Sequence, residues 1–177
     1  LLGHSMGGLI ALEYALSDRP RPDLMVLSAP ALGGGSAWQR AVAPILARLY
    51  PTLSLPTRIT GDMLSRDPAV GEAYLADPLV SSKATTRLGA AIFAAQDRVL
   101  GALQGLSVPT LVIHGEQDSL VPTVSSQPLA SVPGVERRVL SGLRHEMFNE
   151  PEGPEVVAEV IEWINSRITR VPDLGLP

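Results

Sequence analysis

Short apolar runs recur along the chain, and three of them have the character of strands. The runs 23–27 (DLMVL) and 110–115 (TLVIHG) are almost continuously apolar, which is typical of parallel strands buried on both faces. The run 135–140 (VERRVL) alternates apolar and polar positions, which indicates a strand at a sheet edge. We therefore expect three strands, of which the last lies at an edge.

Between these runs, apolar residues recur at the spacing of helices. Segments 6–18 and 154–168 each place apolar side chains on one helical face, namely Leu9, Leu12 and Leu16 in the first and Val156, Val160, Ile164 and Ile168 in the second. Strands that alternate with amphipathic helices predict an α/β fold with a mostly parallel sheet.

The segment 32–106 breaks this rhythm, because it has helical patterns but no convincing strand and is far longer than a crossover needs. We expect a helical cap inserted into a core formed by 1–31 and 107–177. Asp67 as N-cap and Pro68 at the first helical position begin the second of its helices. The three expected cap helices lie at 37–50, 65–77 and 85–103.

Composition narrows the possible functions. The net charge is −4, and no run of basic residues is present to follow a phosphate backbone, so we expect no nucleic-acid partner. The chain has no Cys, which excludes disulfides, thiolate metal sites and a cysteine nucleophile. No apolar stretch reaches the length of a membrane span.

The turn at 3–7 (GHSMG) fits the pattern Gly-X-Ser-X-Gly, in which a strand turns sharply into a helix and exposes the Ser5 hydroxyl. We expect that a Cβ at Gly3 or Gly7 would collide with the neighbouring backbone, and that Gly8 lets the helix approach closely. The apolar residues before the turn and the helix after it favour a nucleophile. The alternative is a glycine-rich turn with an idle serine.

A serine nucleophile needs a histidine base that is oriented by a carboxylate, and in this fold the chain order is Ser, acid, His. His4 adjoins Ser5 and would have to break the turn to reach its hydroxyl. His114 lies in a predicted strand ahead of the candidate acid, which is typical of a structural histidine. His145 follows the third strand and has the required order. We predict His145 as the base.

Asp118 is the best candidate for the acid, because it lies three residues beyond Gly115, at the carboxyl end of a strand. Glu116 in the same loop is the alternative acid, and an Asx turn is the alternative role of Asp118 itself. Four further aspartates fall in the insertion and are interpreted as helix caps or surface residues: Asp62, Asp67, Asp77 and Asp97.

Five stretches together resemble the monoacylglycerol lipase group of the α/β-hydrolase superfamily, which is related to lysophospholipases and to serine aminopeptidase-like hydrolases. The resemblance covers nearly the whole chain, and the stretches near 65–80 and 145–151 are more specific to the group than the serine turn. The stretches are GHSMGG, LSAPAL, SRDPAVGEAYLADPLV, VPTLVIHGEQDSLVP and LRHEMFNEPE.

The resemblance implies Ser5 as nucleophile, Asp118 as orienting acid, His145 as general base and the Met6 backbone amide as one oxyanion donor. It also implies further strands ahead of the turn and a loop there that supplies the second oxyanion amide. We therefore expect the chain to be the C-terminal portion of a longer protein. The implied reaction needs no metal and no organic cofactor.

The cap carries an apolar set, Ile45, Leu46, Leu49, Leu53 and Leu55, that is too large for one helix to bury. These side chains line an acyl channel or meet a membrane surface, or they simply pack the cap onto the core.

Leu46, Leu49 and Met147 are our candidates for an acyl pocket. Met147 and its neighbour Phe148 are explained equally well by packing at the start of a helix.

We expect an esterase that cleaves monoacylglycerols through an acyl-enzyme on Ser5. A lysophospholipase or a general carboxylesterase is the first alternative. An aminopeptidase of the same fold would need acidic cap residues such as Glu72 and Asp77 to bind a free amino terminus. The last alternative is a non-catalytic binding homologue. We expect a cytoplasmic protein with peripheral membrane contact through the cap.

Overall fold

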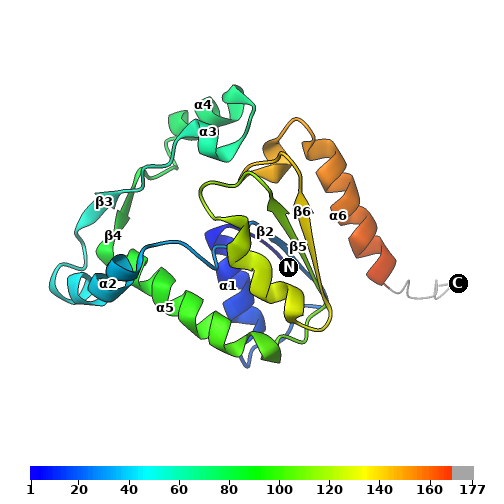
Figure 1. Ribbon diagram of the computed structural model, residues 1–177, viewed down its shortest axis with the longest axis horizontal. Helices are drawn as coiled ribbons and strands as arrows, with labels where there is room; N and C mark the ends of the chain where they lie inside the picture. Colours follow the sequence, from blue (N-terminus) through cyan, green and yellow to red (C-terminus); the bar gives the residue numbers. More distant parts are fainter. Residues whose placement is uncertain (169–177) are drawn as a thin grey trace, which may run out of the picture.

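Four parallel strands form the central sheet of the computed structural model, which describes residues 1–168 (Figure 1). Their order is β1-β2-β5-β6, and each neighbouring pair runs parallel. The strands are β1 (Leu2–His4), β2 (Met25–Ser28), β5 (Thr110–Gly115) and β6 (Val135–Leu140). The expected parallel α/β architecture is confirmed.

The buried run of β5 explains its place inside the sheet. All six of its residues are buried, and it pairs with β2 on one side and β6 on the other. β6 has its predicted bounds and its predicted position at an edge of the described sheet. β2 begins two residues later than predicted and ends one residue later, at Ser28.

Alternation along the strands divides the core into two halves. In β2, Met25 and Leu27 belong to a cluster with helix α1 (Met6–Ala15) and helix α5 (Thr86–Ala102), whereas Val26 belongs to a cluster with helix α6 (Gly153–Arg167). Successive strand side chains point to opposite faces, so one short apolar strand serves both clusters. The sheet is therefore covered by helices on both faces, as Figure 1 shows.

The predicted helical faces are confirmed in α1 and largely in α6. Leu9 and Leu12 are buried and Leu16 packs against them. In α6, Val156 and Val160 are buried and Ile164 packs beside them. The prediction for Ile168 was wrong, because this residue lies beyond the last residue of α6 and is exposed.

The insertion contains an antiparallel strand pair that the sequence analysis missed. β3 (Ser54–Pro56) pairs with β4 (Lys83–Thr85), and the two strands join segments far apart in the sequence. Strands of three residues are too short to produce a recognisable period of two. The expectation of a cap without strands was therefore wrong.

The helices of the insertion are α2 (Ala37–Leu49), α3 (Gly61–Leu64), α4 (Pro68–Ala76) and α5. The three expected helices correspond to α2, α4 and α5, whereas the single turn α3 was not predicted. The predicted start of α4 is confirmed, since the Asp67 side chain accepts a hydrogen bond of 2.9 Å from the Ala69 amide. Helices α2, α3 and α4 and the β3–β4 pair form an arc opposite the sheet in Figure 1. α5 follows the arc and packs Val99 into the core against α1.

The remaining elements are short 3₁₀ helices, which were not predicted: η1 (Leu103–Gly105), η2 (Thr123–Ser131) and η3 (Met147–Asn149). Within residues 1–168, no helix combines the length and the apolar character needed to cross a bilayer.

Candidate active site

The three candidate residues of the Ser-His-Asp set all follow strands that end at one edge of the sheet. Ser5 directly follows β1, Asp118 follows β5, and His145 lies in the loop after β6. Since these strands are parallel, their carboxyl ends meet at the same edge. Ligands and reactive groups gather at this edge in open α/β sheets.

Ser5 lies in a strained turn between β1 and α1. Its φ of 52° and ψ of −119° belong to a region that residues with a side chain rarely occupy, at a cost of about 1–3 kcal/mol. The surrounding backbone fixes this conformation: the Ser5 amide donates to the Ser28 carbonyl at 2.9 Å, and the Ser5 carbonyl accepts from the Ala31 amide at 2.9 Å. This is the geometry expected of a nucleophile turn.

Close contacts require glycine at two positions of the turn, Gly3 and Gly8, whereas we predicted backbone collisions at Gly3 and Gly7. A Cβ at Gly3 would lie 2.6 Å from the Gly7 carbonyl oxygen, and a Cβ at Gly8 would lie 2.9 Å from two atoms of Pro30. The expectation for Gly3 and Gly8 is therefore confirmed. A Cβ at Gly7 would meet no atom within 4 Å, so the expected collision there was wrong. The Gly7 carbonyl oxygen is the atom that lies close to Gly3, whereas the space beside a Cβ at Gly7 is open.

His145 and Asp118 form a buried hydrogen-bonded pair. His145 Nδ1 lies 2.7 Å from Asp118 Oδ2, and both residues are almost fully buried. The other carboxylate oxygen, Oδ1, accepts from the amides of Leu120 and Val121 at 2.9 and 2.8 Å. With Nδ1–H donated to the carboxylate, Nε2 of His145 is the free nitrogen that a base needs.

The charged state of Asp118 is strongly favoured. Burial raises the pKa of this carboxyl, but hydrogen bonds from His114, His145 and the Val121 amide outweigh burial and hold the pKa far below its ordinary value. Asp118 is therefore an anion at neutral pH, as an acid that orients a histidine must be.

His114 is fully buried and satisfied on both nitrogens, as expected for a structural histidine. Its Nε2 donates to the Val121 carbonyl at 2.8 Å and also lies 3.3 Å from Asp118 Oδ2, while Nδ1 contacts the Ser126 hydroxyl at 2.8 Å. The His114 ring thus contacts the same carboxylate oxygen that His145 contacts, and nothing in the sequence pattern indicated this.

His4 packs beside His145 and brings the serine turn next to the candidate base. The two ring centroids are 4.8 Å apart, and His4 Nδ1 contacts the Ser28 hydroxyl at 3.0 Å. Burial, followed by repulsion from His145, lowers the pKa of His4. The lowered pKa favours a neutral His4 ring beside His145.

Glu116, the alternative acid, serves another part of the fold. Its carboxylate accepts from the Ser141 hydroxyl at 2.7 Å and the Gly142 amide at 3.0 Å, at the turn after β6. These hydrogen bonds lower the pKa of Glu116. Asp118 is thus the carboxylate of this loop that contacts His145.

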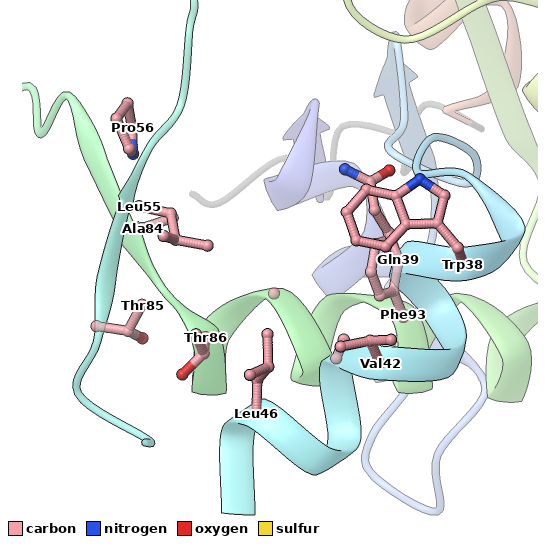
Figure 2. A pocket seen from close by; sticks show the side chains of 12 residues that line it. Trp38, Gln39, Val42, Leu46, Leu55, Pro56, Ala84, Thr85, Thr86 and Phe93 are labelled. Atoms are coloured by element: carbon pink, nitrogen blue, oxygen red, sulfur yellow. The ribbon is translucent and has the colours of Figure 1, made fainter. Parts of the chain in front are cut away.

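An apolar groove of about 250 Å³ lies between α2, α5 and the β3–β4 pair (Figure 2). Leu46 lines it together with Trp38, Val42, Leu55 and Phe93, whose side chains surround the same open space. The lining of the groove is mainly apolar, and it includes none of Ser5, Asp118 and His145.

The other two acyl-pocket candidates do not line this groove. Leu49 is exposed at the end of α2, and Met147 is fully buried in the core with α6.

Two residues near the site carried too little signal in the sequence to be singled out. A Cβ at Gly115 would overlap the carbonyl oxygens of Leu143 and Arg144, so the end of β5 touches the loop that carries His145. The buried carboxylate of Glu150 joins the same loop to the cap. Both contacts are made between segments distant in sequence, where local patterns give no indication.

The parallel sheet, the strained serine turn and the buried Asp118–His145 pair define an α/β-hydrolase. More narrowly, the chain belongs to the family of hydrolases described as serine aminopeptidase, S33, which matches residues 1–152. Fold class and family agree with the resemblance found in the sequence.

Individual relatives are similar over nearly the whole chain. The chain is 37% identical to a monoacylglycerol lipase of Mycolicibacterium smegmatis, over 95% of this chain and 62% of that protein. It is 33% identical to the phospholipase YtpA of Bacillus subtilis, over 88% of this chain and 63% of that protein. The chain thus spans less than two thirds of the length of these two relatives.

The fold is also similar to that of a related enzyme whose crystal structure is known. The monoacylglycerol lipase of Paleococcus ferrophilus superposes with a TM-score of 0.88 at 30% identity, over 94% of this chain and 68% of that one.

Proposed function

We propose that this chain carries the catalytic residues of a serine esterase that cleaves monoacylglycerols into fatty acid and glycerol. The observation that carries the proposal is the buried hydrogen bond between Asp118 and His145 beside the strained Ser5 turn. This arrangement favours nucleophilic catalysis because it supplies a nucleophile, a base and an orienting anion.

In the proposed reaction, Ser5 Oγ attacks the ester carbonyl carbon while its proton passes to His145 Nε2. Asp118 stabilises the imidazolium that forms. The oxyanion of the tetrahedral intermediate accepts a hydrogen bond from the amide of Met6, the first residue of α1. The ester C–O bond then breaks, and His145 returns the proton to the glycerol oxygen.

The second half of the reaction releases the acid. Water attacks the acyl-enzyme carbonyl and gives a proton to His145, the bond between the acyl carbon and Ser5 Oγ breaks, and His145 protonates the serine oxygen. The fatty acid leaves, and the enzyme returns to its starting state.

The lipid substrate is supported by two independent observations. The groove beside Leu46 offers an apolar surface for an acyl chain. Relatives at 37% and 30% identity are named monoacylglycerol lipases. Lysophospholipid is the second candidate, favoured by the 33% identity to a protein named a phospholipase.

The acidic cap residues give little support to an aminopeptidase reaction. Glu72 is exposed on α4, and Asp77 is exposed directly after its last residue. The Asp77 carboxylate already accepts from the Leu79 amide at 2.8 Å, as a residue at a helix end often does.

A substrate panel tests the proposal. Full-length protein and its Ser5→Ala variant are assayed with monooleoylglycerol, a lysophosphatidylcholine, a p-nitrophenyl ester and an aminoacyl p-nitroanilide. We expect the highest kcat/KM for monooleoylglycerol and none above background for Ser5→Ala. Faster lysophospholipid cleavage would reassign the substrate, and turnover of the anilide alone would contradict an esterase.

We also propose that the cap touches lipid surfaces. Several large apolar side chains of the cap are exposed, at values from 45% to 91%. They are Trp38, Ile45, Leu49, Tyr50, Leu53, Leu55, Leu75 and Leu79. So many exposed large apolar side chains in one segment of the chain are typical of an interaction surface.

The contact is tested by co-sedimentation with phosphatidylcholine vesicles. Leu49→Asp should weaken binding, because it places a charge on the proposed contact surface. Ile161→Asp is the matched control, since Ile161 is equally apolar and 51% exposed but lies on α6. Equal binding by both variants would contradict a contact through the cap.

A further inference from the structure

A buried carboxylate joins the cap to the loop that carries His145. The Glu150 side chain is fully buried, and donors surround it on both oxygens. Oε1 accepts from the Arg144 amide at 2.7 Å. Oε2 accepts from the Arg66 amide at 3.0 Å, from Arg66 Nε at 3.1 Å and from the Ser65 hydroxyl at 3.2 Å. A buried charge persists only with partners of this kind.

The backbone on both sides of His145 is tied to the same cap segment. The Arg144 guanidinium donates to the carbonyls of Asp62 and Ser65 at 2.7 and 3.1 Å. The Glu146 amide donates to the Leu64 carbonyl at 2.8 Å. His145 itself therefore lies between two residues that are each bonded to segment 62–66.

We call the contacts of Arg144, Glu146 and Glu150 with segment 62–66 the clamp, and it joins two stretches that are far apart in the sequence. The stretch 65–68 supplies the donors on Ser65 and Arg66, and the stretch 145–151 supplies the acceptor Glu150. Each stretch is incomplete without the other, because unpaired donors or an unpaired carboxylate would remain buried.

We propose that Glu150 is a positioning residue that couples cap segment 62–66 to the placement of His145 against Asp118. The inference rests on the proposed function for its kinetic consequence but not for its geometry. Catalytic groups must be held within a fraction of an ångström, and the support of the surrounding residues decides whether they are. Loss of the clamp frees the loop on both sides of His145.

Glu150→Gln is the decisive variant, because an N–H donor faces each of the two carboxylate oxygens. The amide nitrogen of glutamine has to face at least one of these donors, so the clamp loses a bond and gains a repulsion. Glu152→Gln is the matched control. It makes the same change two residues away, and Glu152 is half-exposed and pairs with the same Arg66. We expect kcat to fall about 10- to 100-fold for Glu150→Gln with KM within about threefold. We expect both constants within about twofold for Glu152→Gln.

A proton NMR measurement reads the placement of His145 directly. The Nδ1–H proton shared with Asp118 should give a far-downfield signal in the wild type and in Glu152→Gln. It should be broadened or lost in Glu150→Gln. If Glu150→Gln does not fold, Arg66→Met provides the same test from the cap side, since it removes the Nε bond and keeps the backbone amide.

The two readouts separate this inference from the proposed function. A wild type without monoacylglycerol turnover that keeps the signal, and loses it in Glu150→Gln, contradicts the function and supports the clamp. A folded Glu150→Gln or Arg66→Met variant that keeps both the signal and the wild-type kcat overturns the clamp.

Discussion

Alanine substitutions at the three glycines of the serine turn should have sharply different effects. The motif Gly-X-Ser-X-Gly by itself treats its two glycines, Gly3 and Gly7, as equivalent. The structure distinguishes them, because a Cβ at Gly3 would lie 2.6 Å from the Gly7 carbonyl oxygen, whereas a Cβ at Gly7 would meet no atom within 4 Å.

The size of the effect follows from the contact distance. Ordinary contacts of a Cβ begin at 3.4 Å, so Gly3→Ala forces the turn to open by about 0.8 Å, the difference between 3.4 and 2.6 Å. The nearest atoms belong to the backbone of Gly7 and Gly8, so no flexible side chain can move out of the way. A displacement near 1 Å at a reacting group costs about 100-fold in rate. We expect a loss of that order in kcat/KM.

Gly8→Ala should resemble Gly3→Ala, since its Cβ would lie 2.9 Å from Pro30. Gly7→Ala should keep kcat/KM within about threefold. It should raise the free energy of unfolding by up to about 0.5–1 kcal/mol, because alanine loses less backbone entropy than glycine in a helix. Steady-state kinetics and urea unfolding measure both quantities. A Gly7→Ala variant as impaired as Gly3→Ala would refute this reasoning.

Three further predictions test single contacts, and one of them includes a comparison variant. Asp118→Asn should lower kcat/KM about 10³- to 10⁴-fold, because the anion that orients the base is lost. The pKa of Asp118 is lowered in the folded state, so the ionised carboxylate stabilises the fold above about pH 4, and this stabilisation is lost as the pH falls towards the lowered pKa. In urea unfolding, the free energy of unfolding of Asp118→Asn should therefore lie below that of the wild type at pH 7, and the difference should be smaller at pH 3. Asp67→Ala should cost about 1 kcal/mol in thermal unfolding through the lost N-cap, with a smaller change for Asp97→Ala, whose pair with Arg40 is exposed. Gly115→Ala should reduce labelling of Ser5 by a serine-directed probe, because the new Cβ overlaps the carbonyl oxygen of Arg144.

The sequence predicted those parts of the fold that depend on local pattern. β5 and β6 have the bounds expected from an unbroken apolar run and from an alternating one. The start of α4 follows from Asp67 and Pro68, which act on their own helix. The chain order of serine, acid and histidine favoured His145, and the position three residues beyond Gly115 favoured Asp118 over Glu116. The structure brings Asp118 and His145 into hydrogen-bond contact.

Features that depend on contacts between distant segments were not predictable in this way. β3 is defined by its pairing with β4, about 30 residues along the chain, and not by its three residues alone. Gly7 was misjudged because the space beside its Cβ depends on tertiary packing. The Glu150 carboxylate resembles any surface glutamate in the sequence, and only the folded chain brings Ser65 and Arg66 to it.

Labelling with a fluorophosphonate probe tests the central claim most directly, because the probe reacts only with a serine that a base has activated. The measurement compares wild-type protein with the Ser5→Ala and His145→Ala variants, each shown to be folded by circular dichroism. The account predicts labelling of the wild type at Ser5 and none in either variant. Labelling that persists in Ser5→Ala, or its absence in folded wild-type protein, would contradict the assignment of Ser5, Asp118 and His145 as the catalytic residues.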